Sequence, residues 1–231
     1  MRKFLSIVFI LLLLSVSCVT QGNGDPFTDE EKRSALYTLL TDMMNLTERN
    51  GEIGKEAFID ELPSSFAVYE DYSPLYQNLS QEYAESLSRI VSPIMEEAYS
   101  MISSSIPLFV VNADDLVIDS VEGMTDRIQN TLAVDIYSFL ISRIEEEREK
   151  LNAAFSESYS IFTSLRDAYS NLESVGMSVS LPIPEPISIE KLAFIAEDVL
   201  FNRLGENERE LRSRIPETED SPYQVFWEET I

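Results

Sequence analysis

Carboxylates are the side chains with which this chain could do chemistry. It contains 41 Asp and Glu residues against 17 Lys and Arg, with one cysteine, no histidine and a formal net charge of -24. Without histidine there is no imidazole base, no Ser-His-Asp triad and no His-ligated metal. Two carboxyl groups about 5 to 9.5 Å apart suffice for glycoside hydrolysis. A histidine-free, glycosidase-like hydrolase working through paired carboxylates is therefore one functional hypothesis.

Local clusters of these acids are better explained by structure than by chemistry. An EF-hand loop starting at Asn112 fails, because Leu116 stands at a ligand position and Val117 where Gly must turn. The charge run over residues 145–150 contains Glu146 and Lys150 at i,i+4 spacing, typical of a solvated helix face. No phosphate-binding loop or nucleophile elbow occurs. We predict no catalytic residue, no cofactor and no metal site, and favour a binding or structural module over an enzyme.

The acidic balance also restricts the partners. Nucleic acids and anionic membrane surfaces bind clustered Lys and Arg, which this chain lacks. We therefore expect no nucleic-acid binding, while basic partners and divalent cations remain open. Hydrophobic residues make up 44% of the chain, which is enough to bury a core and predicts a globular protein.

The N-terminus has the pattern of an export signal. Arg2 and Lys3 precede an apolar run over residues 4–14, and small residues follow. This order predicts a signal peptide over residues 1–17, whose apolar run is too short to span a bilayer.

Cys18 follows this signal as the single cysteine of the chain. Residues 14–18, Leu-Ser-Val-Ser-Cys, resemble a relaxed bacterial lipobox, which implies lipidation at Cys18, although Ser15 and Ser17 also fit an ordinary signal-peptidase cut. Lipidation is favoured because a free thiol at an exported N-terminus would be reactive. Residues 18–27 would then be the lipidated N-terminus and a flexible tether. We expect anchoring to the bacterial cell envelope by this lipid, on the periplasmic face and at the outer membrane.

The remaining residues, 28–231, are predicted to form a single all-α domain, a bundle of amphipathic helices with a Pro-rich extended connector. Thr28 and Glu31 have capping-box spacing, which predicts a helix that ends near Gly51. A second apolar stripe covers residues 79–102, where Pro93 should kink or divide the helix. Residues 106–111 could form a short strand or a buried turn.

Neither Gly nor Pro occurs between Gly123 and Gly176, and apolar residues follow heptad spacing over 137–172. We expect two or more helices here, broken near residues 152–160. A packed bundle and an oligomeric coiled coil use the same spacing, and we favour the bundle. Alternating prolines at 182–186 predict an extended connector. A final helix should run from about residue 188 to 215 with Ser188 as its N-cap.

The stretch from Ala196 to Arg212 is the most specific local signal. It reads Ala-Glu-Asp-Val-Leu-Phe-Asn-Arg-Leu, a Glu-rich turn and Leu-Arg, with Pro216 and Val225-Phe226 beyond. It resembles the closing helix of domain-of-unknown-function family 4197, whose pattern is Ala-x-Asp-Gly-Leu-Phe-x-x-Ile, a Glu-rich turn and Ile-Arg. Residues 62–63 and 89–98 are similar to upstream elements of that family. The resemblance covers about residues 57–231 and implies an exported, all-helical bacterial protein; it assigns no functional residue.

Within this stretch, apolar side chains share one side of the helix, and Arg212 can pair with Glu208 one turn earlier. We interpret the stretch as structural and expect the pair to be exposed. Together these features predict a lipid-anchored envelope protein with a binding or structural role, whose further partner is a protein or an apolar ligand.

Overall fold

The computed structural model describes residues 28–49, 51–66, 78–110, 123–173, 185–213 and 225, and within these ranges it contains helices and no strand. The predicted all-α class is therefore confirmed. None of the helices in these ranges has the length and apolar character needed to cross a membrane. The principal helices are α2 (Asp29–Arg49), α3 (Glu56–Ile59), α5 (Leu79–Phe109), α6 (Gly123–Glu146), α7 (Arg148–Glu173) and α8 (Ile189–Ser213).

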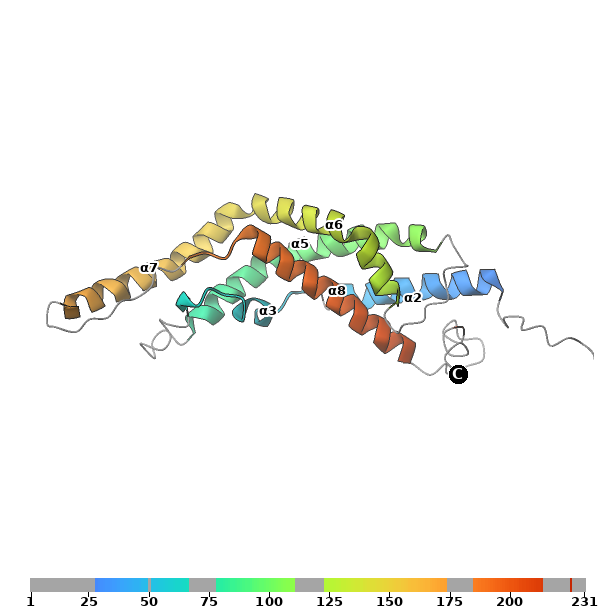
Figure 1. Ribbon diagram of the computed structural model, residues 1–231, viewed down its shortest axis with the longest axis horizontal. Coiled ribbons are helices and arrows are strands. Elements are labelled where there is room, and N and C mark those ends of the chain that lie inside the picture. The colour runs from blue at the N-terminus through green and yellow to red at the C-terminus, as the bar shows by residue number, and fades with distance from the viewer. Residues whose placement is uncertain are drawn as a thin grey trace, which may run out of the picture.

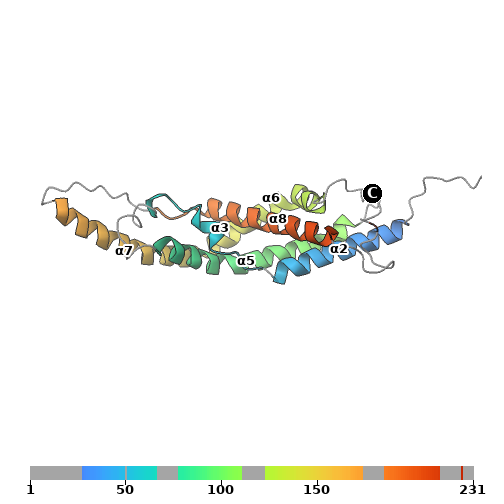
Figure 2. The same cartoon turned by 90° about the horizontal axis from the view of Figure 1, so that it is seen from below.

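The molecule is elongated, as two perpendicular views show (Figures 1 and 2). α2 begins at one end of the long axis and α7 projects at the opposite end. α5 runs between them, packed against α2, α6 and α7, while α8 packs most extensively against α6 and also contacts α2. The start of the described chain is thus far from the α6–α7 junction.

The core follows the apolar stripe predicted on α5. Tyr83, Leu87, Val91, Ala98 and Ile102 are all buried, and they join one continuous apolar cluster with residues of the other long helices. Burial of each large apolar side chain contributes about 1.5–3 kcal/mol relative to exposure. The packing of α5 is therefore a main source of stability for the fold.

α2 begins with the predicted capping box. The Glu31 backbone N–H donates to Thr28 Oγ1 at 3.3 Å, and the Thr28 backbone N–H donates to Glu31 Oε2 at 2.7 Å. These bonds satisfy amides that a helix start otherwise leaves unpaired. They also lower the pKa of the Glu31 carboxyl, chiefly through the backbone bond at Thr28.

α5 contains Pro93 and Pro107 and is nevertheless one element. It bends near its middle (Figure 1), and a proline inside a helix, which removes one helical hydrogen bond, is a common cause of such a bend. Residues 106–109 continue the helix, so the predicted strand or buried turn is wrong there. Ile106 and Phe109 are buried at helical spacing from Ile102, and this spacing extends the helix to residue 109.

The predicted break at residues 152–160 is also wrong, because the helical run breaks at Glu147 instead. There the Glu147 backbone N–H donates to the carbonyl of Ile144, three residues back. Hydroxyls that were expected to end a helix bond within α7: Ser156 donates to the Asn152 carbonyl and Ser160 to the Glu157 carbonyl. α7 therefore continues through this stretch.

Heptad residues of α6 and α7 pack inside the monomer. Ile144, Leu151 and Phe162 are buried, and Phe162 packs edge-on against Phe66 with ring centroids 5.1 Å apart. This packing supports the bundle over the coiled coil for the described part of the stripe. Most of the Pro-rich connector lies outside the described residues; α8 follows it with Ser188 as the predicted N-cap, whose Oγ accepts from the Lys191 N–H at 3.2 Å.

Candidate functional site

The site residue assigned from the sequence, Cys18, lies outside the described residues. So do the predicted signal peptide at 1–17, the tether up to residue 27 and the EF-hand-like residues 112–122. Within the described ranges, no cluster of three or more Asp, Glu or Cys side chains is arranged to hold a metal ion. The groups that could do chemistry therefore have to be sought on the packed helices.

Glu208 is the most buried charged group of α8, with no exposed surface. Its Oε1 accepts the backbone N–H of Met124 at 3.0 Å, and its Oε2 accepts the N–H and hydroxyl of Thr125 at 2.7 and 2.8 Å. These groups belong to the first turn of α6, where unpaired amides and the helix dipole attract a carboxylate. Glu208 thus caps α6 from a different helix.

Arg212 completes this contact, in a way that corrects one expectation. Its Nε donates to Glu208 Oε1 at 2.9 Å, and its Nη2 lies 2.8 Å from the same oxygen. The predicted pair exists, but the prediction that it is exposed is wrong: the exposed fractions of the two side chains are 9% and 0%. Packing of α8 against α6 and α2 covers this end of the helix, and an i,i+4 pattern alone does not reveal such burial.

Two further polar side chains of α8 reach other elements. Asn207 Nδ2 donates to Thr47 Oγ1 on α2 at 2.7 Å, and Arg203 Nη2 donates to the carbonyl of Glu52 at 2.6 Å. Arg203 also lies 3.5 Å from the buried Tyr99 hydroxyl; burial raises the pKa of Tyr99, and the guanidinium opposes the rise. Polar side chains of α8 therefore contact α2 and α5, in addition to the contact of Glu208 with α6.

A surface cleft lies on another side of α8, between its middle and the start of α6. We call it the polar cleft. It has a volume of about 230 Å³, and six of its eight lining side chains are charged or carry amides. Its net charge is negative. The lining residues are Thr125, Asp126, Gln129, Asp198, Phe201, Asn202, Glu206 and Arg209.

A second hollow, which we call the elbow cavity, lies where α6 meets α7 beside the start of α8. Its volume is about 260 Å³, and its lining is mixed, with polar groups, among them the charged Arg148 and Glu190, covering about as much of it as apolar ones. Burial raises the pKa of Tyr83 to about 12, against a hydrogen bond from the Ile187 backbone that lowers it. The phenol is protonated at neutral pH with or without this rise, because its ordinary pKa is already 10.0, and it can donate a hydrogen bond. The lining residues are Tyr83, Arg148, Leu151, Asn152 and residues 186–190.

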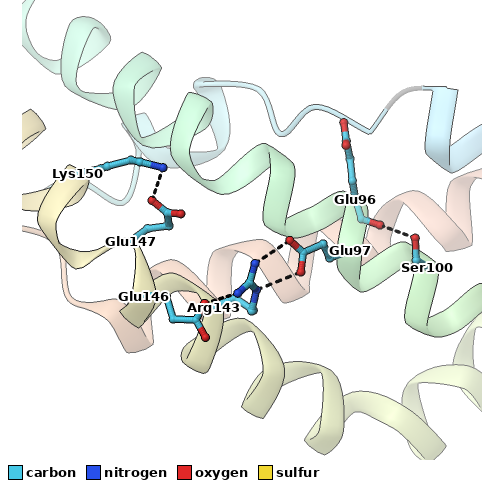
Figure 3. A network of polar contacts seen from close by, with 7 residues as sticks. All are labelled: Glu96, Glu97, Ser100, Arg143, Glu146, Glu147 and Lys150. Carbon is cyan, nitrogen blue, oxygen red and sulfur yellow. Dashed lines mark hydrogen bonds and ion pairs between the residues drawn. The ribbon is translucent and has the colours of Figure 1, made fainter.

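A charged network next to this elbow joins α5 to α6 (Figure 3). Arg143 donates through Nε and Nη2 to both oxygens of Glu97, at 3.0 and 2.9 Å, and also contacts Glu146. Lys150 pairs with Glu147 at 2.6 Å. The predicted Glu146–Lys150 pair is therefore wrong, because the break at residue 147 interrupts the helical register between them. The bidentate contact fixes α6 on α5.

One described carboxyl group has a raised pKa, that of Glu197, mainly through burial and also through the neighbouring Asp198 charge. Glu197 lines neither the polar cleft nor the elbow cavity. A raised pKa in a cleft would have suggested a general acid, so this group does not mark a catalytic pair.

Neither the two hollows nor the capping role of Glu208 was predicted from the sequence. The only available signal was the concentration of Asn, Glu and Arg within residues 202–212, which indicated a polar side of α8 without its partners. Comparison with known proteins adds no assignment, since no family model, no curated protein and no solved structure matches this chain.

Proposed function

We propose that this protein is a lipid-anchored, all-α protein of the bacterial cell envelope with a binding role. The observation that carries the proposal is the elbow cavity and its position in the elongated body. α2 begins at one end, and the α6–α7 junction lies well along the molecule toward the other (Figures 1 and 2). Attached by a lipid at Cys18 and a tether of residues 18–27, the body would present this cavity away from the membrane.

The chemistry of the elbow cavity supports a small ligand that combines an apolar part with a hydrogen-bond acceptor. Leu151, Pro186, Ile187 and Ile189 supply apolar wall, and the Tyr83 hydroxyl supplies a neutral donor. Ligand pockets commonly combine apolar walls with a few polar groups, and most span about 300–1,000 Å³. A cavity of about 260 Å³ lies just below that range and therefore favours a small ligand.

The resemblance of α8 to family 4197 supports the same location, since it implies an exported bacterial protein. Membership of that family stays a prediction. The periplasmic face of the outer membrane is the location we propose, with the lipid-bearing membrane as the first partner and a small ligand or a protein as the second.

The anchoring is tested by growing cells with labelled palmitate. We expect the wild-type protein to carry label and to fractionate with membranes, and Cys18→Ala to lose both properties. Ser17→Ala, which keeps a small residue before the cysteine, is the control and should be labelled. Equal labelling of wild type and Cys18→Ala, or a mature N-terminus other than Cys18, would overturn the lipid anchor.

The binding role is tested with 6-propionyl-2-(dimethylamino)naphthalene, a neutral apolar dye that carries a carbonyl acceptor. Its fluorescence should rise saturably with the purified protein. Asn152→Trp, which places a ring at the exposed rim of the elbow cavity, should abolish most of the rise, whereas Ser156→Trp, on the same exposed side of α7 one turn further, should not. No saturable signal, or an equal loss in both variants, would refute binding in this cavity.

The alternative is a histidine-free hydrolase, and one observation favours keeping it: three carboxylates line the polar cleft, those of Asp126, Asp198 and Glu206. Fluorogenic methylumbelliferyl glycosides test this function. An enzyme should release the fluorophore and lose nearly all activity in Asp198→Asn or Glu206→Gln. Absence of turnover across glucoside, galactoside and N-acetylglucosaminide substrates would reject the alternative.

A further inference from the structure

The polar cleft has a lining unlike that of the elbow cavity. Asp126 and Asp198 offer only acceptors, Arg209 offers only donors, and the amides of Gln129 and Asn202 offer both. Phe201 adds one apolar surface to this lining. Hydroxyl groups both donate and accept, so a ligand rich in hydroxyls matches this mixture better than a group that only accepts or only donates.

The charges that line the polar cleft restrict the class of ligand further. Three carboxylates and one guanidinium line the cleft, so an anion meets net repulsion. An ammonium ion would pair with the carboxylates, but it would also meet Arg209 and amide donors that it cannot satisfy. A neutral ligand avoids both conflicts.

Part of the wall of the cleft is held in place before any ligand arrives. Thr125 is fixed by its two bonds to Glu208. Asn202 Nδ2 donates to Asp198 Oδ2 at 2.9 Å, and the Phe201 ring is seated in the core with 4% of its surface exposed. Groups fixed in this way lose little freedom when a ligand binds.

We propose that the polar cleft binds one ring of a neutral sugar. The planar amide and carboxylate groups of the lining bond its hydroxyls. A volume of about 230 Å³ lies below the usual range for drug-sized ligands and suits a single ring. The inference rests on the binding role proposed above, to which it adds a ligand class and a second place on the molecule.

The experiment uses the mature lipoprotein in a detergent without a sugar headgroup. Glucose, galactose, mannose and N-acetylglucosamine are each tested by saturation-transfer NMR, and the Kd of those that bind is measured by titration. Gln129 and Asn130 are adjacent, exposed residues of α6, of which Gln129 lines the cleft and Asn130 does not. Gln129→Leu should weaken binding about tenfold, a change equivalent to about 1.4 kcal/mol, and Asn130→Leu should leave the Kd unchanged.

Three results would overturn the inference. One is failure of all four sugars to bind; another is equal weakening by the two leucine substitutions. The third is binding of spermidine with a lower Kd than any of the four sugars, which would identify an amine site. Circular dichroism of both variants checks that they are folded. Sugar binding can fail while palmitate labelling and dye binding succeed, so the test separates this inference from the proposed function.

Discussion

At the scale of single residues, burial decides which interactions of α8 matter for stability. Glu208 and Arg212 form a buried pair, whereas Arg148 and Glu145 form a pair with 58% and 48% of their side chains exposed. Removing one partner of a buried pair leaves an uncompensated charge in a poorly solvated place. Removing one partner of an exposed pair leaves a charge that water can solvate.

Arg212→Ala should therefore lower the free energy of unfolding by about 3–5 kcal/mol. Arg148→Ala is the matched control and should cost under about 1 kcal/mol. Urea unfolding monitored by circular dichroism measures both values. Similar small losses in the two variants would mean that the Glu208 carboxylate is solvated in solution.

Phe201 tests the apolar side of the same helix. Its ring is 4% exposed, while the ring of Phe194 on α8 is 54% exposed and lies under the Lys191 ammonium, 5.4 Å from its centroid. Phe201→Ala should cost about 3–5 kcal/mol through lost burial and a cavity, and Phe194→Ala should cost under about 1 kcal/mol. Thermal unfolding of the two variants tests this prediction. Equal decreases in Tm would contradict the packing of α8.

The buried phenol of Tyr83 predicts a loss of stability in alkali. Its pKa rises from 10.0 to about 12 on folding, so between these two values the unfolded chain releases a proton that the folded protein retains. The contribution of this group to the free energy of unfolding is fully present below about pH 10 and decreases as the pH rises toward about 12. Urea midpoints measured over this interval should fall more steeply for wild type than for Tyr83→Phe, and parallel slopes would contradict the prediction.

At the scale of elements, a short segment before α3 is held on α5 by two serines. Ser92 Oγ accepts from the Ile53 N–H at 3.1 Å, and the Ser88 hydroxyl donates to the Ile53 carbonyl at 2.5 Å. Both serines precede Pro93 on α5, Ser92 directly and Ser88 about one turn before Ser92. The backbone N–H and carbonyl of Ile53 are thereby hydrogen-bonded, although this segment belongs to neither a helix nor a sheet.

Ser92→Ala should leave the buried Ile53 amide without its partner and cost about 1–3 kcal/mol. Hydrogen exchange of that amide should accelerate relative to wild type. Ser86→Ala serves as the control, because the Ser86 hydroxyl bonds the Glu82 carbonyl of its own helix. An unchanged exchange rate at Ile53 would show that this bond does not hold the segment.

Local patterns predicted the elements better than their contacts. The capping box of Thr28, the stripe on α5 and the Ser188 cap were all found from sequence, because each depends on neighbours within one or two turns. The break between α6 and α7 was not predicted correctly, since Ser156 and Ser160 can either end a helix or bond within it. Only the packed structure decides between these alternatives.

The candidate sites were less predictable than the helices. Both hollows form between residues far apart in the chain, as with Thr125 and Arg209 in the polar cleft. Neither member of such a pair carries a motif that predicts the other. The burial of Arg212 escaped prediction for the same reason, because it depends on what α8 packs against.

At the scale of the whole molecule, shape can be measured directly. A compact chain of this length has a radius of gyration of about 17 Å. The extended arrangement of α2, α5 and α7 (Figure 2) should give a clearly larger value in small-angle X-ray scattering of the monomer. A measured radius of gyration of about 17 Å would mean that α7 folds back onto the other helices in solution.

The cap that Glu208 places on α6 has a consequence for the order of folding. Thr125 and Glu208 are separated by 83 positions, so the first turn of α6 is completed by a side chain made much later. Long-range contacts of this kind slow folding, and synthesis delivers α8 after α6. For a chain exported as proposed, the first turn of α6 stays uncapped until α8 has been made. The contact between the two helices can form only after both have passed through the membrane as an extended chain.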